Sequence, residues 1–199
     1  MRLSDFCIIQ IGYTAKAKFE PAADGVLAIQ LRDLTEDGLD ITRIARVQVK
    51  ERVDRYLVQA GHVLFRSRGE RNTAAALDES FAEPAIAVSP LMVLRPNPSV
   101  FIPEYLAWAI NQPEAQRHFD TAARGTSIRM VPKASLDALH IDVPDLETQR
   151  RIVAVDALAT RERALAHHLA NTKRDLTNRL LAERSKGKRP ATPKRKSRA

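Results

Sequence analysis

Three short segments of the sequence concentrate side chains that can bind a phosphate group or the edge of a nucleotide base. The first segment contributes Arg66, Ser67, Arg68, Arg71 and Asn72. A guanidinium group is a planar fork of donors that fits a phosphate or a guanine edge, and an asparagine amide fits an adenine edge. We expect this segment to bind nucleic acid. The alternative is that Arg66 and Arg68 pair with carboxylates inside the fold.

The second and third segments offer the same chemistry. The second has no acidic residue and contributes Arg124, Thr126, Ser127, Arg129 and Lys133. Gly125 lets the backbone of this segment approach a ligand closely, and the alternative is a solvated loop that only positions the following residues. The third segment contributes Tyr13, Lys16 and Lys18, although Tyr13 could equally belong to the core.

The positive charge of the chain is concentrated at its end. The net charge is +8, but residues 185–199 hold seven basic residues and no acidic one. Residues 1–144 hold 17 basic and 18 acidic residues, so this part is close to neutral. Any binding of nucleic acid by this part therefore depends on a local patch, to which a basic tail adds at most salt-sensitive attraction.

Sequence patterns for other functions are missing. There is no phosphate-binding glycine loop, no Asn-Pro-Pro-Tyr pattern of a methyltransferase, and no spacing of His and Cys typical of a metal site. We therefore expect no catalytic, cofactor-binding or metal-binding residue in this chain. Cys7 is the only cysteine, and no apolar run is long enough to span a membrane, so we expect a cytoplasmic protein.

The elements that position the three segments read as a mixed α/β domain over residues 1–144. Short runs of alternating or continuous apolar residues predict strands at 26–31, 46–49, 61–65, 85–88, 91–94 and 140–143. A helix is predicted from Pro103 to Ile110, interrupted at Asn111-Gln112-Pro113 and resumed over 114–122. Ser135 is expected to cap a further short helix.

A single long helix is predicted over residues 145–184, with Asp145 as its N-cap. Its apolar residues recur mostly every three, four or seven positions: Ile152, Val155, Leu158, Leu165, Leu169, Leu176 and Leu180. A helix of this length is a rod of roughly 60 Å and cannot bury such a stripe against itself, so a partner helix is expected. The alternative is a solvated helix held by ion pairs. Residues 185–199 are predicted to be a disordered basic tail.

Five motifs in order along the chain resemble the specificity subunits of type I restriction-modification systems. They are the opening Arg2–Thr14, the strand and glycine turn Val58–Gly69, the Pro-Glu-Tyr-Leu helix Ile102–Asn111, the glycine loop Ala123–Ile128, and the junction Leu136–Ile152 with its Pro-Asp-Leu-x-x-Gln pattern. His62 stands where the family usually has Asp, and Thr148 stands where it commonly has Glu.

The resemblance implies a small twisted-sheet target-recognition domain followed by one coiled-coil helix. It implies double-stranded DNA as the ligand and a methylation subunit as partner, with a restriction subunit as an optional further partner. S-adenosylmethionine, ATP and Mg²⁺ would then belong to those partners, and this chain would not be an enzyme itself.

Family members usually carry two recognition domains and two conserved helices, whereas this chain has one of each. The resemblance therefore implies a half-length form that pairs its long helix with a second copy or with another specificity chain. A symmetric pair would read a split site of two identical half-sites. The alternative function is a helix-mediated adaptor of such a system that does not read DNA.

Overall fold

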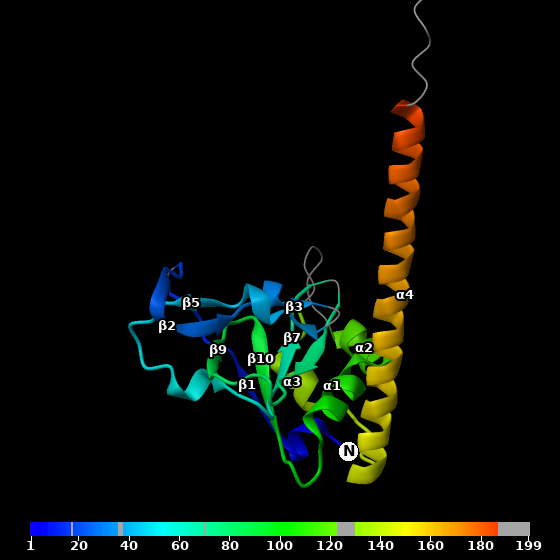
Figure 1. Cartoon of the computed structure of the whole chain (residues 1–199). Helices are drawn as coiled ribbons and strands as arrows, with labels where there is room; N and C mark the ends of the chain where they lie inside the picture. Colours follow the sequence, from blue (N-terminus) through cyan, green and yellow to red (C-terminus); the bar gives the residue numbers. More distant parts are fainter. Residues whose placement is uncertain (17, 36–37, 70, 123–129, 187–199) are drawn as a thin grey trace, which may run out of the picture. The chain divides into compact units, whose positions relative to one another are not determined.

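The computed structural model describes residues 1–16, 18–35, 38–69, 71–122 and 130–186. The chain divides into two compact units, Met1–Val153 and Ala154–Ala199 (Figure 1). The strands are β1 Cys7–Ile11, β2 Pro21–Ile29, β3 Leu34–Thr35, β4 Gly38–Leu39, β5 Ala45–Val47, β6 Leu57–Val58, β7 Val63–Arg66, β8 Ala74–Ala76, β9 Ala85–Ala87 and β10 Leu91–Pro96. The α-helices are α1 Pro103–Asn111, α2 Pro113–Ala122, α3 Lys133–Asp137 and α4 Leu146–Lys186. Single 3-10 turns are η1 Leu3–Asp5, η2 Leu31–Asp33, η3 Ile41–Arg43 and η4 Asp54–Tyr56.

The first unit contains two four-stranded sheets and the two-stranded sheet of β3 and β4. Of the four-stranded sheets, one has the order β1-β10-β7-β8 and is antiparallel throughout, and the other has the order β5-β2-β9-β6 with β2 and β9 parallel. Figure 1 shows β2 and β9 on one side of the first sheet and α1 and α2 on its other side. The mixed α/β class predicted from the sequence is confirmed.

The central strands β7 and β10 of the first sheet are buried on both faces, which explains the continuous apolar run of β7. Phe65 of β7 packs with Phe119 of α2 at a ring-centroid distance of 5.1 Å, in a cluster that also holds Leu106 of α1. Leu64 points to the opposite face and packs with Ile29 of the second sheet. Successive side chains of a strand alternate between faces, so a central strand with two covered faces must be apolar at every position.

The predicted interruption between the first two helices is confirmed and has a structural role. Pro103 begins α1, where its missing N–H is no loss. At the end of α1, the Asn111 side chain accepts a hydrogen bond from the Ala74 N–H (2.8 Å) and donates one to the Ala74 carbonyl (2.9 Å). Asn111 thus pairs with β8 as a neighbouring strand would, and Pro113 starts α2 directly afterwards.

Two local predictions are wrong. Ser135 does not cap a helix, because α3 already begins at Lys133 after Pro132. Residues 140–143 do not form a strand, because His140 makes only an isolated bridge to Arg2. The polar groups of this stretch are instead bonded singly: Ile141 N–H donates to the Met1 carbonyl, and the Asp142 carbonyl accepts from the Tyr105 hydroxyl.

The long helix α4 begins with the predicted cap. The Asp145 carboxylate accepts hydrogen bonds from the Thr148 N–H (2.9 Å) and the Thr148 hydroxyl (2.8 Å), and these bonds hold the pKa of Asp145 below its ordinary value. Ile152, in the second turn, packs against the core of the first unit. The later apolar residues are exposed by 54–69%, namely Val155, Leu158, Leu165, Leu169, Leu176, Leu180 and Leu181.

Candidate nucleic-acid interface

The first predicted segment leaves the sheet at the end of β7. Ser67 is buried, its hydroxyl donates to the Pro90 carbonyl (2.5 Å), and its carbonyl accepts from the Val131 N–H (2.8 Å). Arg68 forms an isolated antiparallel bridge with Met130. These bonds hold the first segment beside Met130 and Val131, which lie near the end of the second segment. Arg124, Thr126, Ser127 and Arg129 lie outside the described residues.

Arg66 supports the backbone of its own loop. Its Nε donates to the Arg68 carbonyl and its Nη1 to the Leu34 carbonyl, both at 3.2 Å. Gly69 has φ +134°, and a Cβ atom there would lie 3.1 Å from the Arg66 guanidinium. A side chain at position 69 would therefore be strained and would crowd the guanidinium, so the glycine allows the loop to fold over Arg66.

Asn72 is also engaged within the fold. It is buried, and its Nδ2 donates to the main-chain carbonyl of Arg66 (3.0 Å). The main-chain carbonyl of Asn72 accepts from the side-chain amide of Gln116 (2.8 Å). The pairing of Asn72 with an adenine edge stays a prediction, and its amide nitrogen is already bonded here. Arg68 and Arg71 are the exposed cations of this loop.

The third segment joins the same region through the turn that precedes β10. The Tyr13 carbonyl accepts from the Ser89 N–H (2.9 Å), one residue before the carbonyl that Ser67 contacts. Tyr13 is buried, as its core alternative stated, and its hydroxyl donates to Glu51 (2.5 Å). Lys16 also pairs with Glu51 (2.7 Å). These two partners hold the pKa of the Glu51 carboxyl below its usual range.

The remaining predicted cations differ in their surroundings. Lys18 is exposed. Lys133 is partly buried in α3 and forms an ion pair with Asp137 (2.7 Å). Part of its charge is therefore balanced within the fold. Parts of all three segments therefore lie at one end of the first sheet. They are held there by the backbone and side-chain bonds of Ser67, by the backbone bond of Tyr13, and by the bridge between Arg68 and Met130.

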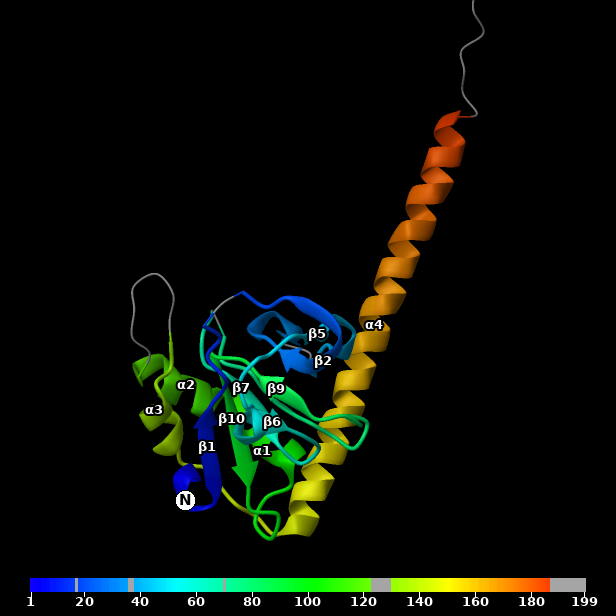
Figure 2. The same cartoon turned by 90° about the vertical axis from the view of Figure 1, so that its left-hand side faces the viewer.

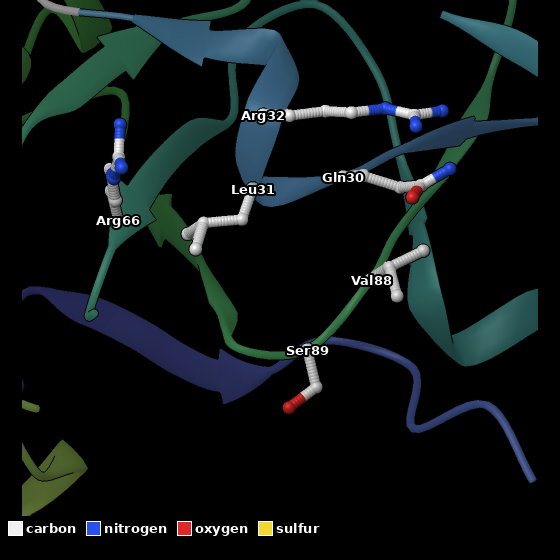
Figure 3. Close-up of a pocket in the computed structure, with 6 residues that line it drawn as sticks. All are labelled: Gln30, Leu31, Arg32, Arg66, Val88 and Ser89. Carbon is white, nitrogen blue, oxygen red and sulfur yellow. The ribbon is translucent and has the colours of Figure 1, made fainter. Parts of the chain in front are cut away.

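A shallow pocket of about 360 Å³ lies at this end of the sheet. It is lined by Gln30, Leu31, Arg32, Arg66, Val88 and Ser89 (Figure 3). Figure 3 shows the Arg66 and Arg32 side chains on opposite sides of Leu31 in that view. Sequence reasoning missed Gln30 and Arg32, because a single arginine after an apolar strand carries no motif. Only the fold places them beside Arg66.

Arg32 lies next to an unusual carboxylate. Asp33 is buried, its Oδ2 accepts from the Gln30 N–H (2.8 Å), and its Oδ1 has no hydrogen-bond partner among the described atoms. The Arg32 Nε lies 3.6 Å from that Oδ1. Burial nevertheless dominates and raises the pKa of Asp33 above its ordinary value.

Within the described residues, no group of three His, Cys, Asp or Glu side chains is placed to hold a metal ion. The helices among those residues include none that could cross a membrane.

Comparison with known proteins identifies the family to which this chain belongs. The model of the type I restriction modification DNA specificity domain matches residues 1–166. The chain therefore belongs to the family of type I restriction-modification DNA specificity domains, and the resemblance noted from its motifs is confirmed. No curated protein matches this chain.

Solved structures with a similar fold include the following three. A chain from a study of complex assembly and conformational transition of the type I restriction-modification system has 22% identity and a TM-score of 0.65, with 89% of this chain and 42% of that one covered. The HsdS subunit from Thermoanaerobacter tengcongensis has 21% identity and a TM-score of 0.57, with 83% and 38% covered.

The S subunit of the type I restriction-modification system from M. genitalium has 13% identity and a TM-score of 0.55, with 90% of this chain and 43% of that one covered. This chain thus spans about two fifths of the length of the solved chains that it resembles.

Proposed function

We propose that this chain reads a DNA sequence and delivers a methylation subunit to it. The observation that carries the proposal is the convergence of Ser67, Tyr13 and the Arg68–Met130 bridge at one end of the sheet. Exposed cations, among them Arg68, Arg71, Lys16 and Lys18, belong to these segments, while the domain as a whole is nearly neutral. A local cationic end of this kind suits contacts to base edges and phosphates.

The chemistry of methylation and of any restriction is assigned to partner subunits. S-adenosylmethionine would be held by the methylation subunit, and ATP with Mg²⁺ by a restriction subunit where one is present. The exposed apolar stripe of α4 is where a second long helix, from another copy or from another specificity chain, would bind. The complex would act in the cytoplasm.

The test uses this chain together with its purified methylation subunit. Methylation of a random DNA library, followed by sequencing of the methylated sites, is expected to return one split target site. Failure to assemble with the methylation subunit, or methylation without sequence preference, would remove the proposal.

Charge reversal separates DNA reading from simple assembly. Arg68→Glu is expected to weaken DNA binding several-fold and to reduce the slope of log affinity against log salt by about one, as loss of a phosphate contact does. Arg2→Glu is the matched control, because Arg2 is exposed and lies at the other end of β1. Arg2 precedes that strand, whereas Tyr13 of the candidate site follows it. Equal DNA binding by both variants, with the complex intact, would support the adaptor alternative instead.

A further inference from the structure

Arg32 is the more exposed of the two arginines in the pocket at the end of the first sheet. The other one, Arg66, already donates to two main-chain carbonyls. The Arg32 side chain is instead 66% exposed, and Figure 3 shows it extending away from Arg66. Ser89 lines the same pocket and donates to the Tyr13 carbonyl, so Arg32 lies at the same end of the sheet as the candidate interface.

The residue after Arg32 is a buried carboxylate with an unfilled acceptor. The Asp33 side chain is 1% exposed, and its Oδ1 has no hydrogen-bond partner among the described atoms. Two bonds fix Asp33 in place: the Gln30 N–H donates to its Oδ2 (2.8 Å), and its own N–H donates to the Gln30 carbonyl (3.0 Å). A buried acceptor without a donor costs free energy. The Arg32 Nε, at 3.6 Å from Oδ1, is one small side-chain rotation away from filling it.

This carboxylate orients the guanidinium of Arg32. With Nε directed at Asp33, the guanidinium presents its two terminal nitrogens, Nη1 and Nη2, to a ligand. Two donors in a fixed fork match the O6 and N7 acceptors of guanine in the major groove. A guanidinium held from behind also loses less conformational entropy when it binds.

The same carboxylate disfavours a phosphate as the ligand of Arg32. A phosphate bound there would bring its negative charge toward that of Asp33, and the burial of Asp33 leaves this repulsion poorly screened by salt. A guanine edge offers acceptors without a net charge and avoids the repulsion. The pair of Arg32 with Asp33 therefore suits a base edge better than the DNA backbone.

We propose that Arg32 reads a guanine of the DNA target and that Asp33 is the positioning residue that holds Arg32 for this contact. The inference rests on the proposed function, and it names one base of the sequence that this domain would select. Both residues lie in the 3-10 turn η2, outside the three segments that the sequence marked as candidates.

The target sequence of altered complexes tests the contact. The full chain is assembled with its methylation subunit, and the methylated sites from a random DNA library are sequenced. Arg32→Ala is expected to lower the preference for guanine about fivefold or more at one position, with the other positions unchanged. Arg32→Gln is expected to accept adenine at that position, because a glutamine amide fits an adenine edge.

Arg43→Ala is the matched control for these variants. The Arg43 Nε pairs with the Asp40 carboxylate (3.0 Å) in the next 3-10 turn, and the Arg43 side chain is 58% exposed. The substitution therefore removes the same kind of exposed, paired charge. In the described part of the chain the pocket is lined by other residues. The target sequence of Arg43→Ala is expected to equal that of the parent.

Two other results for the Arg32 variants overturn the inference. A target unchanged in both means that Arg32 is only a solvated surface residue. Uniformly weaker binding of all sequences, with the slope of log affinity against log salt reduced by about one, means a phosphate contact. The parent complex separates this from the proposed function. A parent that methylates without sequence preference counts against the function, whereas a parent that selects a site unaltered by the Arg32 variants overturns the inference alone.

Asp33→Asn tests the positioning role. It is expected to lower the guanine preference at the same position, by less than Arg32→Ala does, because an uncharged amide holds the guanidinium less strongly. Added to Arg32→Ala, it is expected to have no further effect on that preference. A preference unchanged by Asp33→Asn, or a further loss in the double variant, overturns the positioning role. Arg32 is exposed, so its own variants still test the contact where Asp33→Asn does not fold.

The pH dependence of the guanine preference gives a second readout of that role. Arg32, Arg43 and Asp40 are the charged groups that act on Asp33, but burial outweighs them and raises the pKa of Asp33. The preference of the parent should therefore fall as the pH falls through that pKa, because protonation removes the charge that holds Arg32. The preference of Asp33→Asn should stay constant over the same range. Equal pH profiles for the two proteins overturn the positioning role.

Discussion

The side chain of Gln149 connects the start of α4 to the loop that enters α1, and its removal should destabilise the first unit. Gln149 is fully buried; its Nε2 donates to the carbonyls of Val100 (2.8 Å) and Pro144 (2.9 Å), and its Oε1 accepts from the Ile102 N–H (2.9 Å). Gln149→Ala leaves three backbone groups without these partners. At about 1 kcal/mol for each group, the free energy of unfolding should fall by about 3 kcal/mol.

The measurement is urea unfolding followed by tryptophan fluorescence. Trp108 is the only tryptophan and packs against the core of the first unit, so its signal reports that unit and not the exposed part of α4. For a chain of this size the same loss should lower the melting temperature by roughly 6–12 °C. Gln48→Ala, at an exposed glutamine, is the control and should change stability by less than about 0.5 kcal/mol. If the two variants unfold at the same urea concentration, the reasoning from buried hydrogen bonds is refuted.

Three further outcomes follow from buried polar groups. Ser67→Ala removes the hydroxyl bond to Pro90 and should cost about 1–2 kcal/mol in the same unfolding assay; an unchanged midpoint would contradict this. Burial raises the pKa of Asp33, so its contribution favours the fold at pH values below that pKa and is lost as the pH rises through it. Asp33→Asn should therefore be more stable than the parent at pH 7, with a gain that disappears in acid, and a less stable variant at pH 7 would argue against it. Cys7 is buried, and its thiol should react with a disulfide reagent only after unfolding; fast reaction of the folded chain would disprove its burial.

The sequence predicted those elements whose signals are local. The apolar runs of β7, β9 and β10, the proline breaks around α1 and α2, and the Asp145 cap of α4 all follow from short-range rules. The strand predicted at 140–143 failed because its neighbour is the beginning of the chain, which offers a single bridge through Arg2. Strand pairing depends on what lies alongside, which no local pattern contains.

The candidate site shows the same limit. Residue type selected Ser67 and Asn72 as groups that could face a base, yet their hydrogen bonds go to the carbonyls of Pro90 and Arg66. Those partners are brought near by the pairing of β7 with β10 and by the turn of the loop, and neither can be read from spacing. In the same way, Arg32 became part of the site only because β2 leads into the 3-10 turn beside Arg66.

The internal bonds of Arg66 bear on how a nearly neutral domain can select DNA. The guanidinium fixes the carbonyls of Leu34 and Arg68, so the backbone that presents the exposed Arg68 is already ordered, and binding then costs less conformational entropy. On the proposed function, few cations would also mean few phosphate contacts, so non-specific attraction would be small and the affinity for a single half-site would be modest. A domain built in this way gains most from being linked to a second one, because simultaneous contact with two half-sites multiplies affinity without new contacts. On the proposed function, the near-neutral recognition domain and the exposed apolar face of α4 would both suit the reading of DNA by a pair.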